Sequence, residues 1–320
     1  MYTLEIIKIK HPYNKNEIAN EDIVLILGYF DGVHLAHQQV IKEGVKVARK
    51  NNMKAALMTF NRHPSLVYRK LKRNSYSNLT QPNQKAKLIE ALDVDILYEV
   101  FFNSEFGNLP PEDFVEHYIV GLNAKIVVAG YDYTYGKPDI ATMERLPKYA
   151  NGRFKIVEIG EEKQSGETIS STMIRGYLDE GEVEKANAML GYNYETEGFV
   201  IHGDARGREL GYPTANVHSH PYTLLPKNGV YAVYLTVKGK RYPGMASIGY
   251  NITFKDEKKL SVEVNIFDFD EQIYGDDVKI EWIAYLRPEL KFNGVSELIK
   301  QLDQDELDSR KILEKNLGKD

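Results

Sequence analysis

The feature that most constrains the fold is a change of pattern near the middle of the chain. In the first half, short apolar runs alternate with segments of helical periodicity. Strands separated by helices predict βαβ units, and therefore a parallel sheet with helices on both faces. The apolar runs lie at 23–27, 55–60, 94–100, 126–129 and 154–159, and the helical patterns at 38–50, 83–92, 111–122 and 141–149.

In the second half, from Glu195 onward, helical periodicity gives way to strand-like segments separated by turns, at 229–237, 240–250, 260–269 and 277–286. Closely spaced strands without intervening helices predict an antiparallel sandwich or barrel. A helix over about 295–315 closes the chain. Because 320 residues exceed a typical single domain, we predict two domains, 1–186 and 187–320.

The composition excludes several classes of function. A net charge of −5 and a pI near 6.0 argue against bulk affinity for nucleic acid or an anionic membrane. The chain contains no cysteine, which removes disulfides, thiolate chemistry and cysteine-based zinc sites. Neither a signal peptide nor an apolar run long enough to span a bilayer is recognisable, so we expect a cytoplasmic protein. The oligomeric state is left open.

The first candidate site is the segment GYFDGVHLAH, residues 28–37, between a buried strand and a helix. Ligands of parallel sheets collect at such strand ends, and backbone N–H groups at a helix start bind anions. Gly28 and Gly32 permit close backbone approach, and His34 and His37 would share the first helical turn. The pattern therefore indicates a phosphate site. Surface histidines without a role, or metal ligands, are the alternatives, and the GxxxxGK[ST] and GxGxxG phosphate loops are missing.

A second polar cluster, ISSTMIRG, covers residues 169–176 before a helix. Ser170 or Ser171 could cap that helix, which is the commoner use of such residues. Alternatively, the hydroxyls could hold a phosphate together with Arg175, which shares a helix face with Ser171.

The third cluster is the glycine-rich segment GDARGRELGYPTAN, residues 203–216. Open N–H groups at Gly203, Gly207 and Gly211, with guanidinium groups at Arg206 and Arg208, suit an anionic ligand. A flexible basic hairpin loop is the alternative.

The end of this segment supplies oxygen ligands. Thr214 and Asn216 point the same way in an extended chain and could reach one Mg²⁺ ion, which takes its other ligands from water and nucleotide phosphates. Farther on, Glu263 and Asn265 share the strand face opposite three aliphatic residues. Glu263 is either a solvated surface residue or, if that face lines a pocket, a candidate base for an alcohol nucleophile.

These motifs, in their order and over essentially the whole chain, resemble the bacterial bifunctional riboflavin kinase/FMN adenylyltransferases, or FAD synthetases. GYFDGVHLAH, MTFNRHP (58–64), GYDYTYGK (130–137) and ISSTMIR (169–175) are similar to their nucleotidyltransferase module. GRELGYPTAN, SVEVNIFDF, IYGDDV and YLRPELKF are similar to their riboflavin kinase module. The resemblance implies a Rossmann-like N-terminal domain, and a six-stranded antiparallel barrel with a terminal helix.

The resemblance also implies two ATP- and Mg²⁺-dependent reactions. Riboflavin and ATP would give FMN and ADP, and FMN and ATP would give FAD and pyrophosphate. In the second reaction the FMN phosphate attacks the α-phosphorus of ATP and needs no general base. The implied ligand-binding residues are Gly28, Phe30, Asp31, Gly32, His34, His37, Asp132, Ser171, Thr172 and Arg175 in the first half, and Gly203, Arg206, Gly207, Arg208, Gly211, Thr214 and Asn216 in the second.

Specific roles follow from the same resemblance. His34 and His37 would bind the ATP phosphates and stabilise the transition state, whereas Ser171, Thr172 and Arg175 would hold the departing pyrophosphate. In the kinase, Glu263 would be the catalytic base, with Thr214 and Asn216 as the Mg²⁺ ligands. Asp132 would lie near the nucleotide or the flavin.

The chain departs from the family pattern at three positions. Ala36 replaces the glycine of the HxGH motif, Arg62 replaces a proline, and Asn265 replaces a histidine. The first two leave open a riboflavin kinase with weak or lost adenylyl transfer and a regulatory first domain. A non-catalytic flavin-responsive regulator that binds RNA is a third hypothesis, against which the acidic balance counts.

Overall fold

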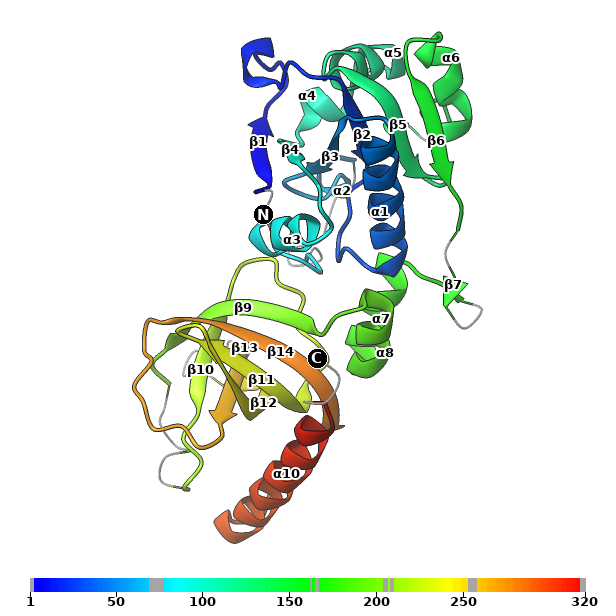
Figure 1. Cartoon of the computed structure of the whole chain (residues 1–320). Helices are drawn as coiled ribbons and strands as arrows, with labels where there is room; N and C mark the ends of the chain where they lie inside the picture. The colour runs from blue at the N-terminus through cyan, green and yellow to red at the C-terminus, as the bar shows by residue number, and fades with distance from the viewer. Residues whose placement is uncertain are drawn as a thin grey trace. The chain divides into compact units, whose positions relative to one another are not determined.

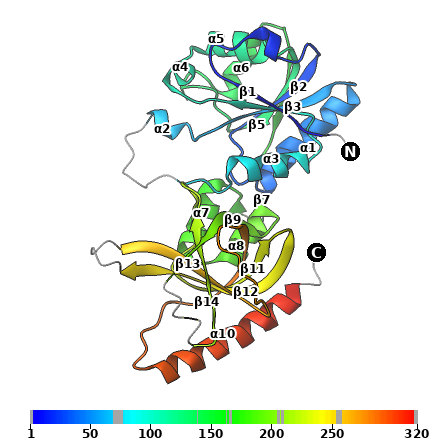
Figure 2. The same ribbon diagram turned by 90° about the vertical axis from the view of Figure 1, so that its left-hand side faces the viewer.

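The structure is a computed structural model that describes residues 3–68, 77–137, 139–161, 163–164, 167–203, 207, 210–252 and 258–316. The chain divides into two compact units, Met1–Ser170 and Ser171–Asp320, shown in Figures 1 and 2.

The first unit is built on a six-stranded sheet in the order β1-β4-β3-β2-β5-β6, with every neighbouring pair parallel. Strand β2 lies near its centre, and all five of its residues are buried because both faces of the sheet are covered. The prediction of a parallel sheet is confirmed. The strands are β1 (Glu5–Ile9), β2 (Ile23–Leu27), β3 (Lys54–Phe60), β4 (Ile96–Val100), β5 (Ala124–Gly130) and β6 (Lys155–Ile159).

Helices pack on both faces of this sheet (Figure 1). One apolar cluster includes Ile41 of α1 and Ile89 of α3, and the other includes Phe114 of α5 and Tyr118 of η2. The predicted helix over 111–122 is α5 followed by the π-helix η2. The elements are η1 (Lys15–Glu17), α1 (Leu35–Lys50), α2 (Ser65–Tyr68), α3 (Pro82–Glu90), α4 (Ser104–Gly107), α5 (Pro111–Val115), η2 (Glu116–Val120), η3 (Met143–Arg145) and α6 (Leu146–Ala150), with a small sheet of β7 (Lys163–Gln164) and β8 (Glu167–Thr168).

Three of the sequence motifs follow adjacent strands of the sheet. The loop at 28–34 follows β2, the segment from Asn61 follows β3, and the segment from Tyr131 follows β5. Strands β3 and β5 flank β2 on opposite sides, so the chain order reverses there. Because the carboxyl ends of parallel strands meet at one edge, this is the crevice where open α/β sheets bind ligands.

The second unit contains a closed antiparallel barrel in the order β10-β13-β12-β11-β14-β9. The expected choice between sandwich and barrel is thereby settled. The elements are α7 (Ser171–Glu180), α8 (Val183–Leu190), β9 (Tyr194–Ile201), β10 (Ala215–Ser219), β11 (Gly229–Val237), β12 (Lys240–Ile252), β13 (Lys258–Ile266), β14 (Asp277–Arg287) and α10 (Val295–Asn316).

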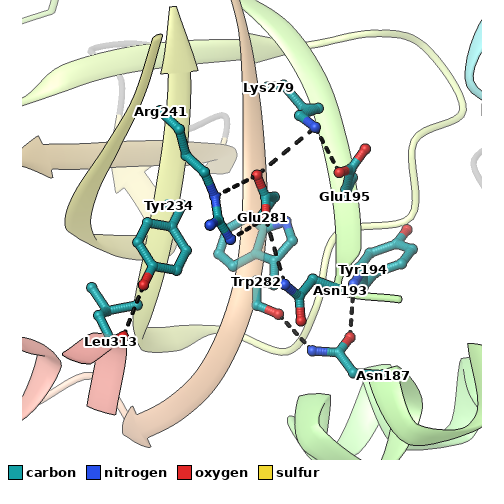
Figure 3. Close-up of polar contacts among 10 residues, drawn as sticks. All are labelled: Asn187, Asn193, Tyr194, Glu195, Tyr234, Arg241, Lys279, Glu281, Trp282 and Leu313. Atoms are coloured by element: carbon teal, nitrogen blue, oxygen red, sulfur yellow. Dashed lines mark hydrogen bonds and ion pairs between the residues drawn. The ribbon is translucent and has the colours of Figure 1, made fainter. Parts of the chain in front are cut away.

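Helix α8 is fastened to the barrel by one asparagine. Asn187 donates from Nδ2 to the carbonyl oxygen of Trp282 at 2.9 Å and accepts from the backbone N–H of Tyr194 at 2.7 Å (Figure 3). Because the second compact unit begins at Ser171, it includes residues 171–186, which the sequence pattern assigned to the first domain.

A buried carboxylate stabilises one side of the barrel (Figure 3). Glu281 on β14 accepts hydrogen bonds from Arg241 on β12, at 3.0 and 2.7 Å, and its carboxylate lies 3.8 Å from the Lys279 ammonium. Lys279 also pairs with Glu195 on β9 at 2.7 Å. The buried charge is thus paired, as burial of a carboxylate requires.

Candidate functional sites

The loop between β2 and α1 has an unusual backbone. Phe30, Gly32 and Val33 have φ angles of +53°, +83° and +35°. Only the glycine adopts this region without strain, and each of the other two costs on the order of 1–3 kcal/mol. Both Phe30 and Val33 are buried, so packing holds them there. A Cβ at Gly28 would lie 2.5 Å from the Phe30 ring, which explains the need for glycine at that position.

Asp31 fixes this loop from inside the fold. Its buried carboxylate accepts hydrogen bonds from the backbone N–H groups of Leu79 at 3.1 Å and Thr80 at 3.3 Å. The Thr80 hydroxyl in turn accepts from the backbone N–H of Gly32 at 3.1 Å. These contacts show that Asp31 holds the loop in place. Its expected role in ligand binding stays a prediction.

The two histidines lie together at the start of α1. His34 is the N-cap, and its Nδ1 accepts from the backbone N–H of His37 at 3.4 Å. The imidazole rings stack with centroids 3.5 Å apart and planes 19° from parallel. The predicted proximity of these side chains is therefore confirmed.

Both rings are held in the neutral form. Burial lowers the pKa of His34 from 6.5 to about 4. The pKa of His37 lies well below its usual value, because of burial first and then of unfavourable electrostatic interactions with His34 and Lys85. Two imidazolium rings could not stack at this distance without strong repulsion. At neutral pH the pair can donate hydrogen bonds to a phosphate but supplies no positive charge.

A cation that the sequence patterns did not single out lies beside this loop. Lys85 on α3 is 5% exposed, and its ammonium donates to the Tyr29 carbonyl oxygen at 2.9 Å and to the Thr59 hydroxyl at 3.3 Å. The ammonium also lies 4.2 Å from the centroid of the Tyr29 ring. A lysine at a core-facing position of an amphipathic helix was the available signal, because lysine is rarely buried without a reason.

Three other residues of the first half were singled out in the sequence, and the structure gives the position of each. Asp132 is exposed just after β5, with its carboxylate close to Gly130. Ala36 lies within the first turn of α1, where helical geometry accepts a methyl group. The Arg62 guanidinium lies 4.8 Å from the centroid of the Phe101 ring.

The cluster Ser171, Thr172 and Arg175 occupies the first turns of α7, in the second compact unit. Its capping and phosphate-binding alternatives both stay predictions.

The second site forms around Glu263 on β13. As predicted, Val262 and Val264 are buried, whereas Glu263 lies on the opposite face of the strand and is only partly buried. The Thr214 hydroxyl donates to Oε2 of Glu263 at 3.3 Å, and Asn265 donates from Nδ2 to the Pro213 carbonyl oxygen at 2.8 Å. The segment at 213–216, called the PTAN turn, leads into β10 and is therefore held against β13 at two adjacent points.

This face of β13 lines a pocket of about 290 Å³. Thr214, Glu263 and Asn265 supply part of its polar wall, together with the backbone at Gly207. Its apolar wall comes from β12, from the segment before α10 and from α10 itself: Met245, Leu290, Phe292, Leu298 and Leu302. A mostly apolar hollow with a few convergent polar groups is the usual form of a small-molecule site.

The three glycines of the segment 203–211 are required for different structural reasons. A Cβ at Gly203 would lie 2.1 Å from the amide of Asn216, and one at Gly207 would lie 2.2 Å from the Tyr212 carbonyl oxygen. Gly211 has a φ of +81°. Arg206 and Arg208, predicted to bind the anionic ligand, lie outside the described residues.

The oxygen donors of the PTAN turn fit a magnesium ion. Asn216 pairs with Glu263 in the register of β10 and β13, so the Thr214 hydroxyl and the Asn216 amide lie on the same side as the carboxylate. Two neutral oxygen ligands do not suffice alone, but they suit an ion that keeps waters and binds nucleotide phosphates.

Both halves of the chain match known family models. Residues 16–173 match the model described as FAD synthetase, and residues 190–313 match the one described as riboflavin kinase.

Two curated relatives cover nearly the whole chain, and both are described as bifunctional riboflavin kinase/FMN adenylyltransferases. The protein from Listeria monocytogenes is 47% identical over 98% of this chain and 99% of its own. The protein from Bacillus subtilis is 41% identical over 94% of this chain and 96% of its own.

A solved structure from Streptococcus pneumoniae is also similar, with 37% identity and a TM-score of 0.88 over 95% of this chain and 99% of that one. It is described as a macrolide-efflux protein. Among the described residues of the present chain, no helix combines the length and the apolar character that crossing a membrane requires.

Proposed function

Because the chain belongs to the family of bifunctional riboflavin kinase/FMN adenylyltransferases, we propose that it makes FMN from riboflavin and then FAD from FMN, using ATP in both steps. The observation that carries this proposal is that each half matches its own family model and contains its own cluster of polar side chains. The strained loop and stacked histidines of the first unit favour two activities over a kinase with a purely regulatory first half.

In the kinase, we propose that Glu263 is the catalytic base. Its carboxylate would take the proton from the ribityl 5′-hydroxyl of riboflavin as that oxygen bonds to the γ-phosphorus of ATP and ADP leaves. The hydrogen bond from Thr214 orients the carboxylate. Thr214 and Asn216 would hold Mg²⁺, which when bound neutralises charge on the ATP phosphates. Arg206 and Arg208 would contact the same phosphates.

The pocket beside Glu263 supports the flavin as the kinase substrate. The apolar wall from α10 and the preceding segment suits an aromatic ring system, and the carboxylate end suits the polar ribityl chain.

In the adenylyltransferase, we propose that His34 and His37 bind the α-phosphate of ATP. Their neutral rings would donate hydrogen bonds that strengthen as negative charge develops on the phosphate oxygens during attack by FMN. Ser171, Thr172 and Arg175 would hold the departing pyrophosphate.

The loop glycines would serve the same phosphate. Gly28 and Gly32 keep the backbone close-packed, and Phe30 fixes the shape of the turn. Asp132 would lie near the nucleotide or the flavin. The relatives' names support riboflavin, FMN and ATP as small-molecule partners, and we propose a cytoplasmic location.

One assay tests the proposal. The purified protein is incubated with riboflavin, ATP and Mg²⁺, and the flavins are separated over time. We expect FMN to appear first and FAD afterwards. FMN alone, with FMN and ATP inert when added directly, would favour a kinase with a regulatory first half, and absence of turnover would contradict both proposals.

A further inference from the structure

We propose that Lys85 is a positioning residue of the adenylyltransferase, whose buried ammonium attracts the phosphates of ATP to the histidine loop. This inference rests on the proposed adenylyl transfer. It assigns the positive charge of the site to a residue outside the sequence motifs.

The charge at Lys85 is poorly compensated by the protein. Among the described residues no carboxylate forms an ion pair with it, and its two hydrogen-bond acceptors, the Tyr29 carbonyl and the Thr59 hydroxyl, are neutral. An ammonium has three protons to donate, so one stays available at this position. The carboxylates of Asp31 and Glu99 act on the ammonium without forming an ion pair with it. A buried cation with no anion in direct contact is costly unless an anion completes its surroundings. An ATP phosphate near the loop would be such an anion.

The position of Lys85 matches the crevice of the sheet. Tyr29 lies directly after β2, and Thr59 is the penultimate residue of β3, so the ammonium bridges the carboxyl ends of two adjacent parallel strands. Its bond to the Tyr29 carbonyl also anchors the first residues of the loop that carries His34 and His37. The cation thus acts on the phosphate site both by its field and through this loop.

The histidine pair cannot provide this charge itself. Burial holds both rings neutral, and the nearby His34 and Lys85 further lower the pKa of His37. The two kinds of side chain therefore contribute differently to phosphate binding. The ammonium supplies a positive electrostatic field, and the neutral imidazole rings supply directed hydrogen bonds.

The protonation of Lys85 predicts a pH dependence of adenylyl transfer that a purely structural role would not produce. Burial lowers the pKa of the ammonium to about 8, and the carboxylates of Asp31 in the loop and Glu99 on β4 partly oppose this. The ring of Tyr29 also lies beside it, with its centroid 4.2 Å from the ammonium. The two histidines near it are His37 on α1 and its stacked partner His34. Both are already neutral at alkaline pH.

Since kcat/KM reports the ionisation of the free enzyme, adenylyl transfer should decline as the pH rises through about 8. The kinase reaction of the same polypeptide, measured on the same samples, should lack this decline.

The experiment measures initial rates of FAD formation from FMN and ATP between about pH 6.5 and 9.5. In wild type we expect a basic limb in kcat/KM for ATP. Lys85→Met should lower kcat/KM by about tenfold to a hundredfold and abolish the limb. Lys85→Arg, whose guanidinium stays charged, should restore activity at alkaline pH. Lys87→Met, on the exposed side of the same helix, is the matched control and should behave as wild type.

A wild-type profile without a decline above pH 8, or a decline that Lys85→Met retains, would overturn the role of Lys85 while adenylyl transfer itself stands. Failure of the wild type to convert FMN at any pH would instead contradict the proposed function. The kinase rate of each variant shows that its second unit is intact, and its circular dichroism spectrum shows that the first unit is folded.

Discussion

The ion pair between Arg287 and Asp305 joins α10 to the barrel, and its removal offers a quantitative test of the second unit. Arg287 on β14 donates from Nε to Oδ1 at 2.9 Å and from Nη2 to Oδ2 at 2.6 Å. Only 4% of the Asp305 side chain and 15% of that of Arg287 are exposed. Removing one partner of a buried pair leaves the other charge uncompensated, which costs about 3–5 kcal/mol. We therefore expect Asp305→Ala to destabilise the barrel by that amount.

The assay uses the fluorescence of Trp282, the single tryptophan of the chain, which is fully buried in the barrel. With a urea m-value of about 2 kcal/mol/M, the predicted loss lowers the unfolding midpoint by roughly 2 M. Asp308→Ala is the matched control, because the half-exposed Asp308 side chain on the same helix lies 3.5 Å from Lys311. This surface pair is worth less than about 1 kcal/mol.

Equal losses in the two variants would refute the reasoning, since they would mean that burial does not distinguish the pairs. A further check combines Asp305→Leu with Arg287→Met. The double variant should be more stable than Asp305→Ala, because no unpaired charge is left. Asp305→Ala should also raise KM for riboflavin, because Asp305 and Arg287 themselves line the pocket, next to Leu302 of α10.

Three other predictions concern single side chains. Gly28→Ala should lower adenylyl transfer by about tenfold or more, because the new Cβ would lie 2.5 Å from the Phe30 ring, while the kinase rate stays unchanged; an unaffected FMN-to-FAD rate would contradict this. Asn265→Leu removes the hydrogen bond to the Pro213 carbonyl and should lower kinase kcat by about tenfold, and retention of full kcat would show that the PTAN turn needs no such support. Finally, folding lowers the pKa of His34 from 6.5 to about 4, so the unfolded chain binds more protons than the folded one between these pH values. The free energy of unfolding therefore decreases as the pH falls through this window, by up to about 3 kcal/mol. Urea unfolding followed by circular dichroism at pH 7 and pH 4.5 measures this loss, which His34→Gln should reduce; an identical pH dependence in both proteins would contradict it.

The architecture could be predicted well because it follows local patterns. Period-two alternation places Glu263 and Asn265 opposite Val262 and Val264, and the structure confirms that assignment. The pocket beside Glu263 could not be predicted, since α10 and the segment before it follow β13 later in the chain and reach it only through tertiary packing.

In the first site, too, local features could be predicted from the sequence and tertiary contacts could not. The position of His34 and His37 at a helix start follows from the turn pattern, and their stacking is a close-range consequence. The hydrogen bonds that Asp31 accepts from Leu79 and Thr80 could not be predicted, because both residues lie far along the chain. The core-facing position of Lys85 on α3 was a signal of burial, but its contacts with Tyr29 and Thr59 arise only from tertiary packing.

The central claim is that one chain carries two separate active sites, and mixing two variants tests it most directly. Glu263→Gln should form no FMN from riboflavin yet convert added FMN to FAD, whereas His34→Ala should stop at FMN. Given riboflavin, ATP and Mg²⁺, neither variant alone should make FAD, and an equimolar mixture should make it, because FMN released by one protein is adenylylated by the other. Absence of FAD from the mixture, although Glu263→Gln converts added FMN and His34→Ala releases it, would contradict passage between independent sites. Loss of both activities in either folded variant would contradict the assignment of the two sites themselves.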